Sequence, residues 1–204
     1  MKQRTTRDNQ TFMALAGAAL LCCSLGAAAQ PGGNSAAAGG ASAPKAGTAA
    51  TQGSPVSVDR ADRAFVEAAA RDGMAEVMVG RMAQDKASNA QVKAFGERMA
   101  QDHGKANAEL LMIAGTRGIA APNDAGAEHK KHADRLTKLS GADFDRAYMK
   151  LMVEDHAKDV KSFERASKSA KDADIRAFAA RTLPTLQSHL QMARTTQAAV
   201  KAAK

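Results

Sequence analysis

Three histidines and one glutamate stand at positions where the surrounding helical pattern is apolar. Glu76 lies in "GMAEV", His103 and His156 each follow an aspartate in a "DH" pair, and His189 lies in "LPTLQSH". Three imidazoles and one carboxylate form a ligand set that suits a divalent metal such as zinc, iron or copper. The nearby carboxylates that could act as further ligands, or as acceptors for the imidazole N–H groups, are Asp102, Asp155 and Asp159.

Long amphipathic helices are needed to position these side chains. Apolar residues recur every three or four positions, and no alternating strand pattern persists, so the spacing predicts an all-α domain. We expect four long helices, near 59–87, 90–115, 141–169 and from Asp172 to about 199, and a short helix near 126–138. The expected helix caps are Ser88-Asn89, Asp172, and a capping box formed by Ser140 with Asp143.

Each long helix carries one candidate ligand on its apolar stripe. The stripe of the first helix is Phe65, Ala69, Gly73, Glu76, Gly80 and Ala83, and that of the second is Val92, Phe95, Met99, His103, Ala106, Leu110 and Ile113. The later stripes are Phe144, Tyr148, Met152, His156, Val160 and Phe163, then Ile175, Phe178, Thr182, Leu186, His189 and Ala193. If the third long helix runs parallel to the second, the four polar residues fall within roughly one to two helical turns of mid-bundle.

The connection over 116–140 is long enough to return the chain from one end of the helices to the other. The expected fold is therefore a ferritin-like four-helix bundle of two antiparallel hairpins, joined by a long crossover with a short extra helix. "DRAF" at 62–65 matches "DRAY" at 145–148, and "VKAF" at 92–95 matches "IRAF" at 175–178. Both matches have an offset of 83 residues, which indicates a duplicated hairpin, although similar composition alone is the alternative explanation.

The first 29 residues have the layout of a secretory signal peptide. A basic start precedes an apolar run over 12–25, and three alanines at 27–29 supply small residues for cleavage. The stretch 30–57 is small, polar and nearly uncharged, which predicts a disordered low-complexity linker. We therefore expect an exported protein, in the periplasm or associated with the outer membrane, whose bundle domain covers 58–204.

Charge and composition argue against a nucleic-acid binder. Removing the first 29 residues takes away three basic residues and one acidic residue, which lowers the formal net charge from +8 to +6. The remaining charges are interspersed, and Tyr148 is the only tyrosine in a chain without tryptophan, so base-stacking surfaces are scarce. No later segment approaches about eighteen uncharged apolar residues, so we expect no transmembrane segment in the mature chain.

Motifs of several enzyme classes are missing. The sequence has no Gly-rich phosphate loop and no serine in a nucleophile-elbow pattern. A di-iron carboxylate bundle needs Glu-x-x-His on two helices, whereas Ala100 stands three residues before His103 and Leu186 three before His189. Ferroxidase chemistry is therefore not expected.

Three separate phrases resemble the bacterial family catalogued as domain of unknown function 4142. They are "FVEAAARDGMAEVMVGRMAQDKASNAQVKAFGERMAQDHGKANAEL" at 65–110, "SGADFDRAYMKLMVEDHAKDVKSFE" at 140–164 and "IRAFAARTLPTLQSHLQMA" at 175–193. The resemblance extends in order over 59–195. It implies an exported ferritin-like helical bundle and supplies no established reaction, substrate or catalytic residues. The residues of this sequence that match the family pattern are Glu76, Asp102-His103, Asp155-His156 and His189.

The leading hypothesis is a cell-envelope bundle that is non-enzymatic or weakly metal-binding, with the glutamate and the three histidines as ligands. One alternative is an envelope interaction or structural module without metal, in which the histidines specify packing and the linker tethers the bundle near a protein partner. A further alternative is a metal-dependent oxidoreductase, against which the missing Glu-x-x-His pairs count. The sequence leaves open the metal, the partner and the oligomeric state.

Overall fold

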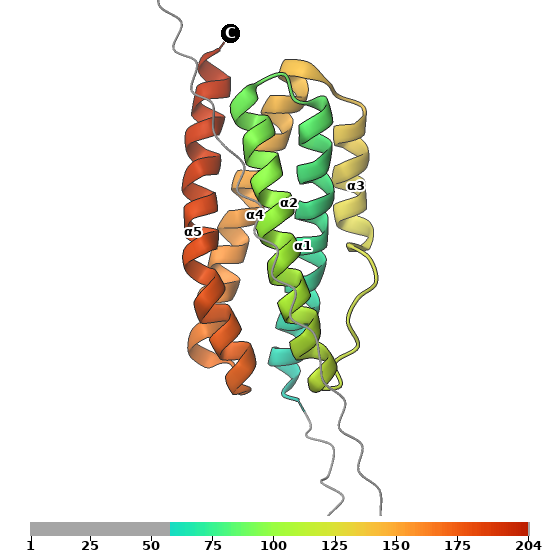
Figure 1. Cartoon of the computed structure of the whole chain (residues 1–204), viewed down its shortest axis with the longest axis vertical. Helices are drawn as coiled ribbons and strands as arrows, with labels where there is room; N and C mark the ends of the chain where they lie inside the picture. Colours follow the sequence, from blue (N-terminus) through green and yellow to red (C-terminus); the bar gives the residue numbers. More distant parts are fainter. Residues whose placement is uncertain (1–57, 204) are drawn as a thin grey trace, which may run out of the picture. The chain divides into compact units, whose positions relative to one another are not determined.

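The computed structural model describes residues 58–203, and this part of the chain is all-helical, with five helices and no strand. The helices are α1 (Arg60–Lys86), α2 (Ala90–Thr116), α3 (Gly126–Thr137), α4 (Gly141–Ser169) and α5 (Ala173–Ala202) (Figure 1). The predicted helices are confirmed to within a few residues. The predicted signal peptide at 1–29 and linker at 30–57 lie outside the described residues. None of the helices described is long and apolar enough to span a membrane.

Side chains before three of the long helices cap their first turns. Asn89 accepts hydrogen bonds from two backbone N–H groups of α2, and Asp172 does the same for α5, as predicted. Asp59 caps α1 in the same way. The capping box predicted for α4 is wrong, because the side chain of Ser140 makes no cap hydrogen bond. Asp143, its expected partner, instead forms an ion pair with Arg146 on the exposed surface.

Two hairpins, α1–α2 and α4–α5, account for most of the helix packing. The carboxylate of Asp62 in α1 accepts hydrogen bonds from backbone N–H groups in the α4–α5 turn. The carboxylate of Asp145 in α4 does the same in the α1–α2 turn. The start of α4 therefore lies beside the end of α1, so α4 runs antiparallel to α1 and parallel to α2.

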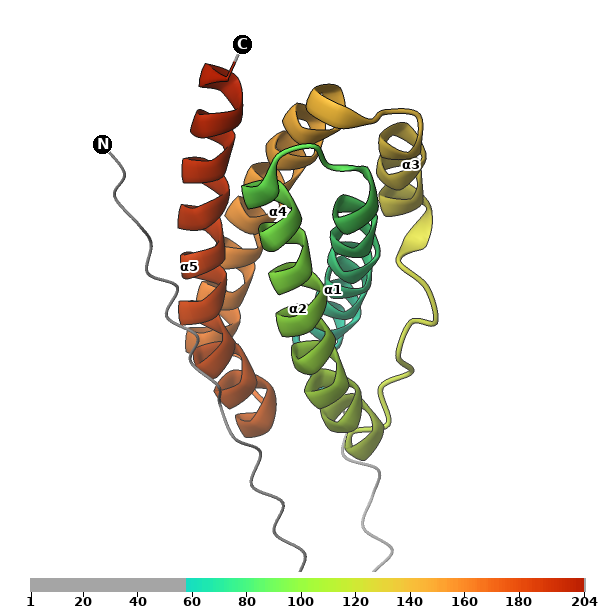
Figure 2. The ribbon, with the colours of Figure 1, turned by 45° about the horizontal axis from the view of Figure 1, so that its top comes forward.

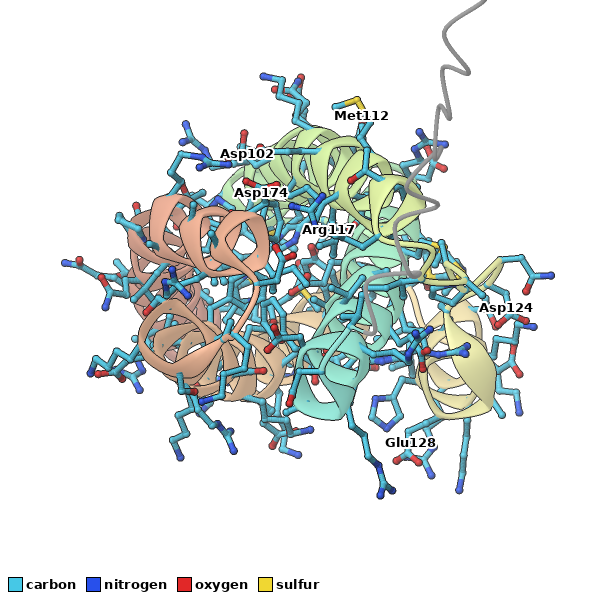
Figure 3. All side chains as sticks on the ribbon, turned by 90° about the horizontal axis from the view of Figure 1, so that it is seen from below. Asp102, Met112, Arg117, Asp124, Glu128 and Asp174 are labelled. Atoms are coloured by element: carbon cyan, nitrogen blue, oxygen red, sulfur yellow. The ribbon has the colours of Figure 1, made fainter. Side chains whose placement is uncertain are left out.

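The crossover between the hairpins runs along the outside of α1 (Figures 1 and 2). Helix α3 packs against α1, where His129 pairs with Asp72 and Lys86 donates to the carbonyl oxygens of residues 137 and 139. At the end of the molecule that faces the viewer in Figure 3, Arg117, just after α2, forms ion pairs with Asp172 and Asp174 of the other hairpin. The chain thus crosses from one end of the long helices to the other, as the length of 116–140 predicts.

The buried apolar residues form two clusters. One includes Met99 and Met152, and the other includes Leu110 and Phe163. On each long helix the candidate ligand lies between a residue of one cluster and a residue of the other. The polar residues therefore form a layer across the middle of the interior, and burial of a polar layer is costly unless its groups find partners. That layer is made by Glu76, His103, His156, Asp159 and His189.

Candidate metal centre

His103 from α2, His156 from α4 and His189 from α5 meet in the polar layer, and we call them the histidine cluster. Each offers a ring nitrogen, and these nitrogens all lie within 4.8 Å of one another. The ring centroids are separated by 5.4 Å, 5.4 Å and 5.5 Å. The three side chains are buried, with residue exposures of 7%, 0% and 2% respectively. The level and face predicted for the three histidines are therefore correct.

Close packing of α1 on α2 brings Glu76 against this cluster. A Cβ added to Gly80 would lie 2.7 Å from the carbonyl oxygen of Gly96, and one added to Gly96 would lie 2.6 Å from the Cβ of Ala83. The absence of side chains at both glycines lets the two backbones approach. Oε2 of Glu76 then lies 2.8 Å from Nδ1 of His103.

Hydrogen-bond partners assign the protons on two of the rings. Nδ1 of His156 lies 2.9 Å from the carbonyl oxygen of Met152, one helical turn earlier. A carbonyl oxygen only accepts, so this Nδ1 carries a hydrogen. The ionised carboxylate of Glu76 likewise only accepts, so Nδ1 of His103 carries a hydrogen. In the neutral forms of both rings, Nε2 is therefore the unprotonated nitrogen.

The ring of His189 is also fixed by an oxygen acceptor, in this case the carboxylate of Asp102 on α2. Its Nε2 lies 3.0 Å from Oδ2 of Asp102, which leaves Nδ1 as the nitrogen that is free to bind. This Nδ1 is buried and has no hydrogen-bond partner among the described residues. Figure 3 shows Asp102 on the side of α2 that faces α5. Each histidine of the cluster thus has one nitrogen bonded to an oxygen acceptor and one nitrogen left with a lone pair.

The two Nε2 atoms of His103 and His156 lie 3.4 Å apart. Two neutral rings would direct lone pairs at each other here, so a cation or a proton must lie between them. Two nitrogens bound to one tetrahedral zinc ion at about 2.0–2.1 Å lie roughly 3.3–3.4 Å apart. The observed separation fits a shared metal, and it also permits a hydrogen bond from a protonated His103 to His156.

Electrostatics in the layer keep Glu76 ionised and favour a positive charge beside it. Burial opposes ionisation of Glu76, but its interactions with the neighbouring histidines, with His103 above all, outweigh burial and lower the pKa of that carboxyl. Burial also disfavours protonation of His103, yet its contact with Glu76 raises the pKa of that ring above 6.5. Burial lowers the pKa of His156, and it lowers that of His189 to about 4. Two of the three rings are thus neutral at pH 7, as metal ligation requires.

The predicted carboxylates take different places around the cluster. Glu76 and Asp102 accept from imidazole nitrogens, the role that outer carboxylates have in many histidine metal sites. Asp159 is buried beside Glu76 and His156, and one oxygen from each carboxylate lies within 4.8 Å of the other and of a His156 nitrogen. Burial, followed by the charge of Glu76, raises the pKa of Asp159. Asp155 is not brought into the cluster and instead pairs with Lys158 at 3.7 Å.

Some contacts of the layer were not predicted from the sequence. The carbonyl of Met152 orients His156, a contact that the i, i+4 spacing on one helix could have indicated. Nε2 of His129 on α3 lies 2.7 Å from Oδ1 of Asp72. Its partner comes from another helix, so no local pattern signals the pair.

A groove of about 620 Å³ lies between α2 and α5, beside the cluster. Its lining includes His189 and Asp102, together with the exposed side chains of Arg98 and Lys105. His103 and His156 do not line it, so the groove borders the cluster on the side of Asp102. A metal with three histidine ligands would have at least one further coordination position.

Comparison with known proteins gave one family match. The model of the family described as "Domain of unknown function (DUF4142)" matches residues 46–196, which include the whole polar layer. No curated protein and no solved structure matched the chain.

Proposed function

The chain belongs to the DUF4142 family, and for this member we propose a role in binding a divalent transition metal in the cell envelope. The observation that carries the proposal is the convergence of three buried lone-pair nitrogens, on His103, His156 and His189. Each of these rings is fixed by an oxygen acceptor on its other nitrogen. Such acceptors select the tautomer and orient a ring for metal binding.

Zinc is the metal that the proposal favours, with iron and copper as the other candidates. Three imidazole nitrogens suit all three metals, and the 3.4 Å spacing of two of the nitrogens agrees with tetrahedral zinc. Glu76 is assigned to the outer shell rather than to the ligands, because its carboxylate bonds Nδ1 of His103. The fourth ligand in this proposal is water or a small anion that enters from the α2–α5 groove.

We classify the domain as a ferritin-like four-helix bundle, with α1, α2, α4 and α5 as its members and α3 as an addition on the crossover. The directions of the four helices and the long crossover support this classification. The ligand set differs from that of di-iron bundles, because neither His103 nor His189 has a glutamate three residues earlier. We therefore propose metal binding or storage in place of oxygen-dependent redox chemistry.

The envelope location rests on the N-terminal sequence. Residues 1–29 have the order of basic, apolar and small residues that directs secretion, and 30–57 have the composition of a tether. An exported protein would meet metal ions outside the cytoplasm, where a buried site with one open position can capture them.

Isothermal titration of the metal-free purified protein with zinc tests this function. We expect one zinc ion per chain, and a loss of affinity of at least about a hundredfold in His189→Gln. His132→Gln is the matched control, since His132 lies on α3 and is not among the residues of the cluster. Circular dichroism of each variant checks that the helices are retained.

Zinc affinity that is equal in the two variants would overturn the proposal. A protein that remains metal-free in zinc, iron and copper would instead favour the interaction module, in which the histidines only specify packing. In that case the His189→Gln variant would retain any protein partner captured by the wild type.

A further inference from the structure

Next to the histidine cluster, we propose a second cation site of different chemistry, in which Glu76 and Asp159 bind a hard divalent cation through oxygen. This site goes beyond the proposed function, because it does not use the three nitrogens that would hold the first metal. Mn²⁺ is the probe for it, since carboxylate and carbonyl oxygens suit Mn²⁺, Mg²⁺ and Ca²⁺.

Two buried carboxylate oxygens, Oε1 of Glu76 and Oδ2 of Asp159, accept no hydrogen bond from the described residues. Oε1 of Glu76 lies 3.3 Å from Nδ1 of His156, but the hydrogen of that nitrogen is donated to the carbonyl of Met152. The two residues are only 2% and 6% exposed. Buried polar atoms are nearly always satisfied, so a pair of orphan oxygens indicates a ligand that completes them.

An enclosed cavity of about 20 Å³ is lined by both of these residues, and we call it the carboxylate cavity. About 10–15 Å³ is enough for a single water-sized occupant, so the cavity fits one ion and excludes a hydrated one. Glu76, Asp159 and His156 also offer ligand atoms that lie within 4.8 Å of one another. Nδ1 of His156 already donates to the carbonyl of Met152, so the atoms left to bind are oxygens.

Asn107 supplies a neutral oxygen at the same cavity. It lines the cavity together with Gly73, and a Cβ added to Gly73 would lie 2.3 Å from Oδ1 of Asn107. The missing side chain at Gly73 therefore leaves room for the amide. Asp72 is a further lining residue, and its carboxylate is held by His129.

The charge balance supports a second cation. Glu76 and Asp159 are the two carboxylates of the polar layer, and a divalent cation between them would neutralise both, displacing the proton that burial favours on Asp159. No lysine or arginine within the described residues forms an ion pair with Glu76 or Asp159. A second divalent cation would complete the balance, and uncompensated charge in an interior is strongly unfavourable.

The duplication explains why two carboxylates face one cavity. Glu76 and Asp159 are 83 residues apart, the offset that also relates "DRAF" to "DRAY". By the same offset His103, His156 and His189 correspond to Leu186, Gly73 and Ala106, and all three of these line the carboxylate cavity. The cavity is thus the counterpart of the histidine cluster in the other half of the fold. It keeps the carboxylate of that half but none of the histidines.

The test is a titration of zinc-loaded protein with Mn²⁺, followed by the loss of the electron paramagnetic resonance signal of free Mn²⁺. Bound zinc blocks the histidine cluster, so we expect one further Mn²⁺ per wild-type chain. Asp159→Asn keeps the shape of the side chain and should weaken Mn²⁺ binding at least about tenfold. Asp155→Asn is the matched control on the same helix and should bind Mn²⁺ like the wild type. Asn107→Ala, a second variant that removes a neutral ligand, should also weaken it.

The two proposals can fail separately. Full zinc loading without any Mn²⁺ bound would overturn the second site and leave a shared proton between the two carboxylates. Equal Mn²⁺ binding by Asp159→Asn and wild type would also overturn it, since the ion would then lie elsewhere. If zinc does not bind, the same titration on metal-free protein still decides the second site, with Asp159→Asn as the discriminating variant.

Discussion

Asp62 and Asp145 make the same contact at opposite ends of the molecule. Each lies near the start of a helix, and each carboxylate accepts hydrogen bonds from backbone N–H groups in the turn of the other hairpin. The two aspartates are 83 residues apart, and so are the turns that they bind, at 88–89 and 171–172. This reciprocal contact supports duplication of a hairpin over similar composition. It also sets the relative height of the two hairpins, and thereby the level of the polar layer.

Removing one of these carboxylates should destabilise the fold. Asp145 is 2% exposed and accepts hydrogen bonds from the backbone N–H groups of Ser88 and Asn89. Asp145→Ala leaves these donors unpaired, which should cost about 1–3 kcal/mol of unfolding free energy. Asp143→Ala in the same turn removes an exposed carboxylate and should change stability by less than about 0.5 kcal/mol. Urea unfolding measures the change in unfolding free energy for both variants. Equal changes would mean that the contact of Asp145 with the other hairpin contributes nothing to stability.

Two glycines on the first hairpin should respond to alanine in opposite directions. Alanine at Gly80 would place its Cβ 2.7 Å from the Gly96 carbonyl oxygen, and the resulting shift of α1 from α2 should cost about 1–3 kcal/mol. Gly104 has open space where its Cβ would lie, so Gly104→Ala should stabilise α2 by about 0.5–1 kcal/mol. Thermal unfolding of the two variants tests this. A stabilised Gly80→Ala variant would show that α1 and α2 need no close approach.

Loss of the outer carboxylates should weaken metal binding without abolishing it. Glu76→Gln and Asp102→Asn keep an acceptor near His103 and His189 but remove the negative charge that increases the basicity of the rings. Zinc affinity should fall about 10–100-fold in each variant. A complete loss of stoichiometric zinc in Glu76→Gln would make Glu76 a direct ligand, as the sequence alone suggested. Calorimetric titration distinguishes the two outcomes. The control is Glu97→Gln, which removes an exposed carboxylate of α2.

Zinc affinity should depend on pH chiefly through His103. Contact with Glu76 outweighs burial and raises the pKa of His103 above 6.5, whereas burial lowers the pKa of His189 to about 4. Below the pKa of His103, zinc must displace one proton, so the dissociation constant should rise about tenfold for each pH unit of acidification. The dependence should become steeper near pH 4, where His189 also gains a proton. A dissociation constant that does not change between about pH 6 and pH 5 would contradict the assigned ligands.

Helical periodicity was sufficient to predict the all-helical fold and the level of the four polar residues. Glu76, His103, His156 and His189 each interrupt an apolar stripe, and a stripe fixes which face of a helix is buried. Counting residues from the turns then gives the height of each side chain, because the rise per residue is constant. The length of the crossover over 116–140 predicted the direction of the third long helix.

The role of each residue within the site could not be predicted from these patterns. Whether Glu76 meets the metal or a ring nitrogen depends on ångström-scale spacing of α1 and α2, which Gly80 and Gly96 determine across the interface. The orientation of His156 depends on the carbonyl of Met152. Asp155 is adjacent to His156 in sequence and Asp159 is three residues away, yet only Asp159 is buried beside Glu76 and His156. The side chain of Ser140 does not cap α4, and Asp143 pairs with Arg146, neither of which the capping pattern reveals.

Anomalous diffraction at the zinc edge from crystals of the zinc-loaded protein tests the central claim most directly. The account predicts one peak in the polar layer, about 2.0–2.1 Å from Nε2 of His103, Nε2 of His156 and Nδ1 of His189. Glu76 and Asp102 should remain on the outer nitrogens of His103 and His189. Ordered zinc only at surface carboxylates, with an unchanged 3.4 Å contact between the two Nε2 atoms and no peak beside it, would contradict the account.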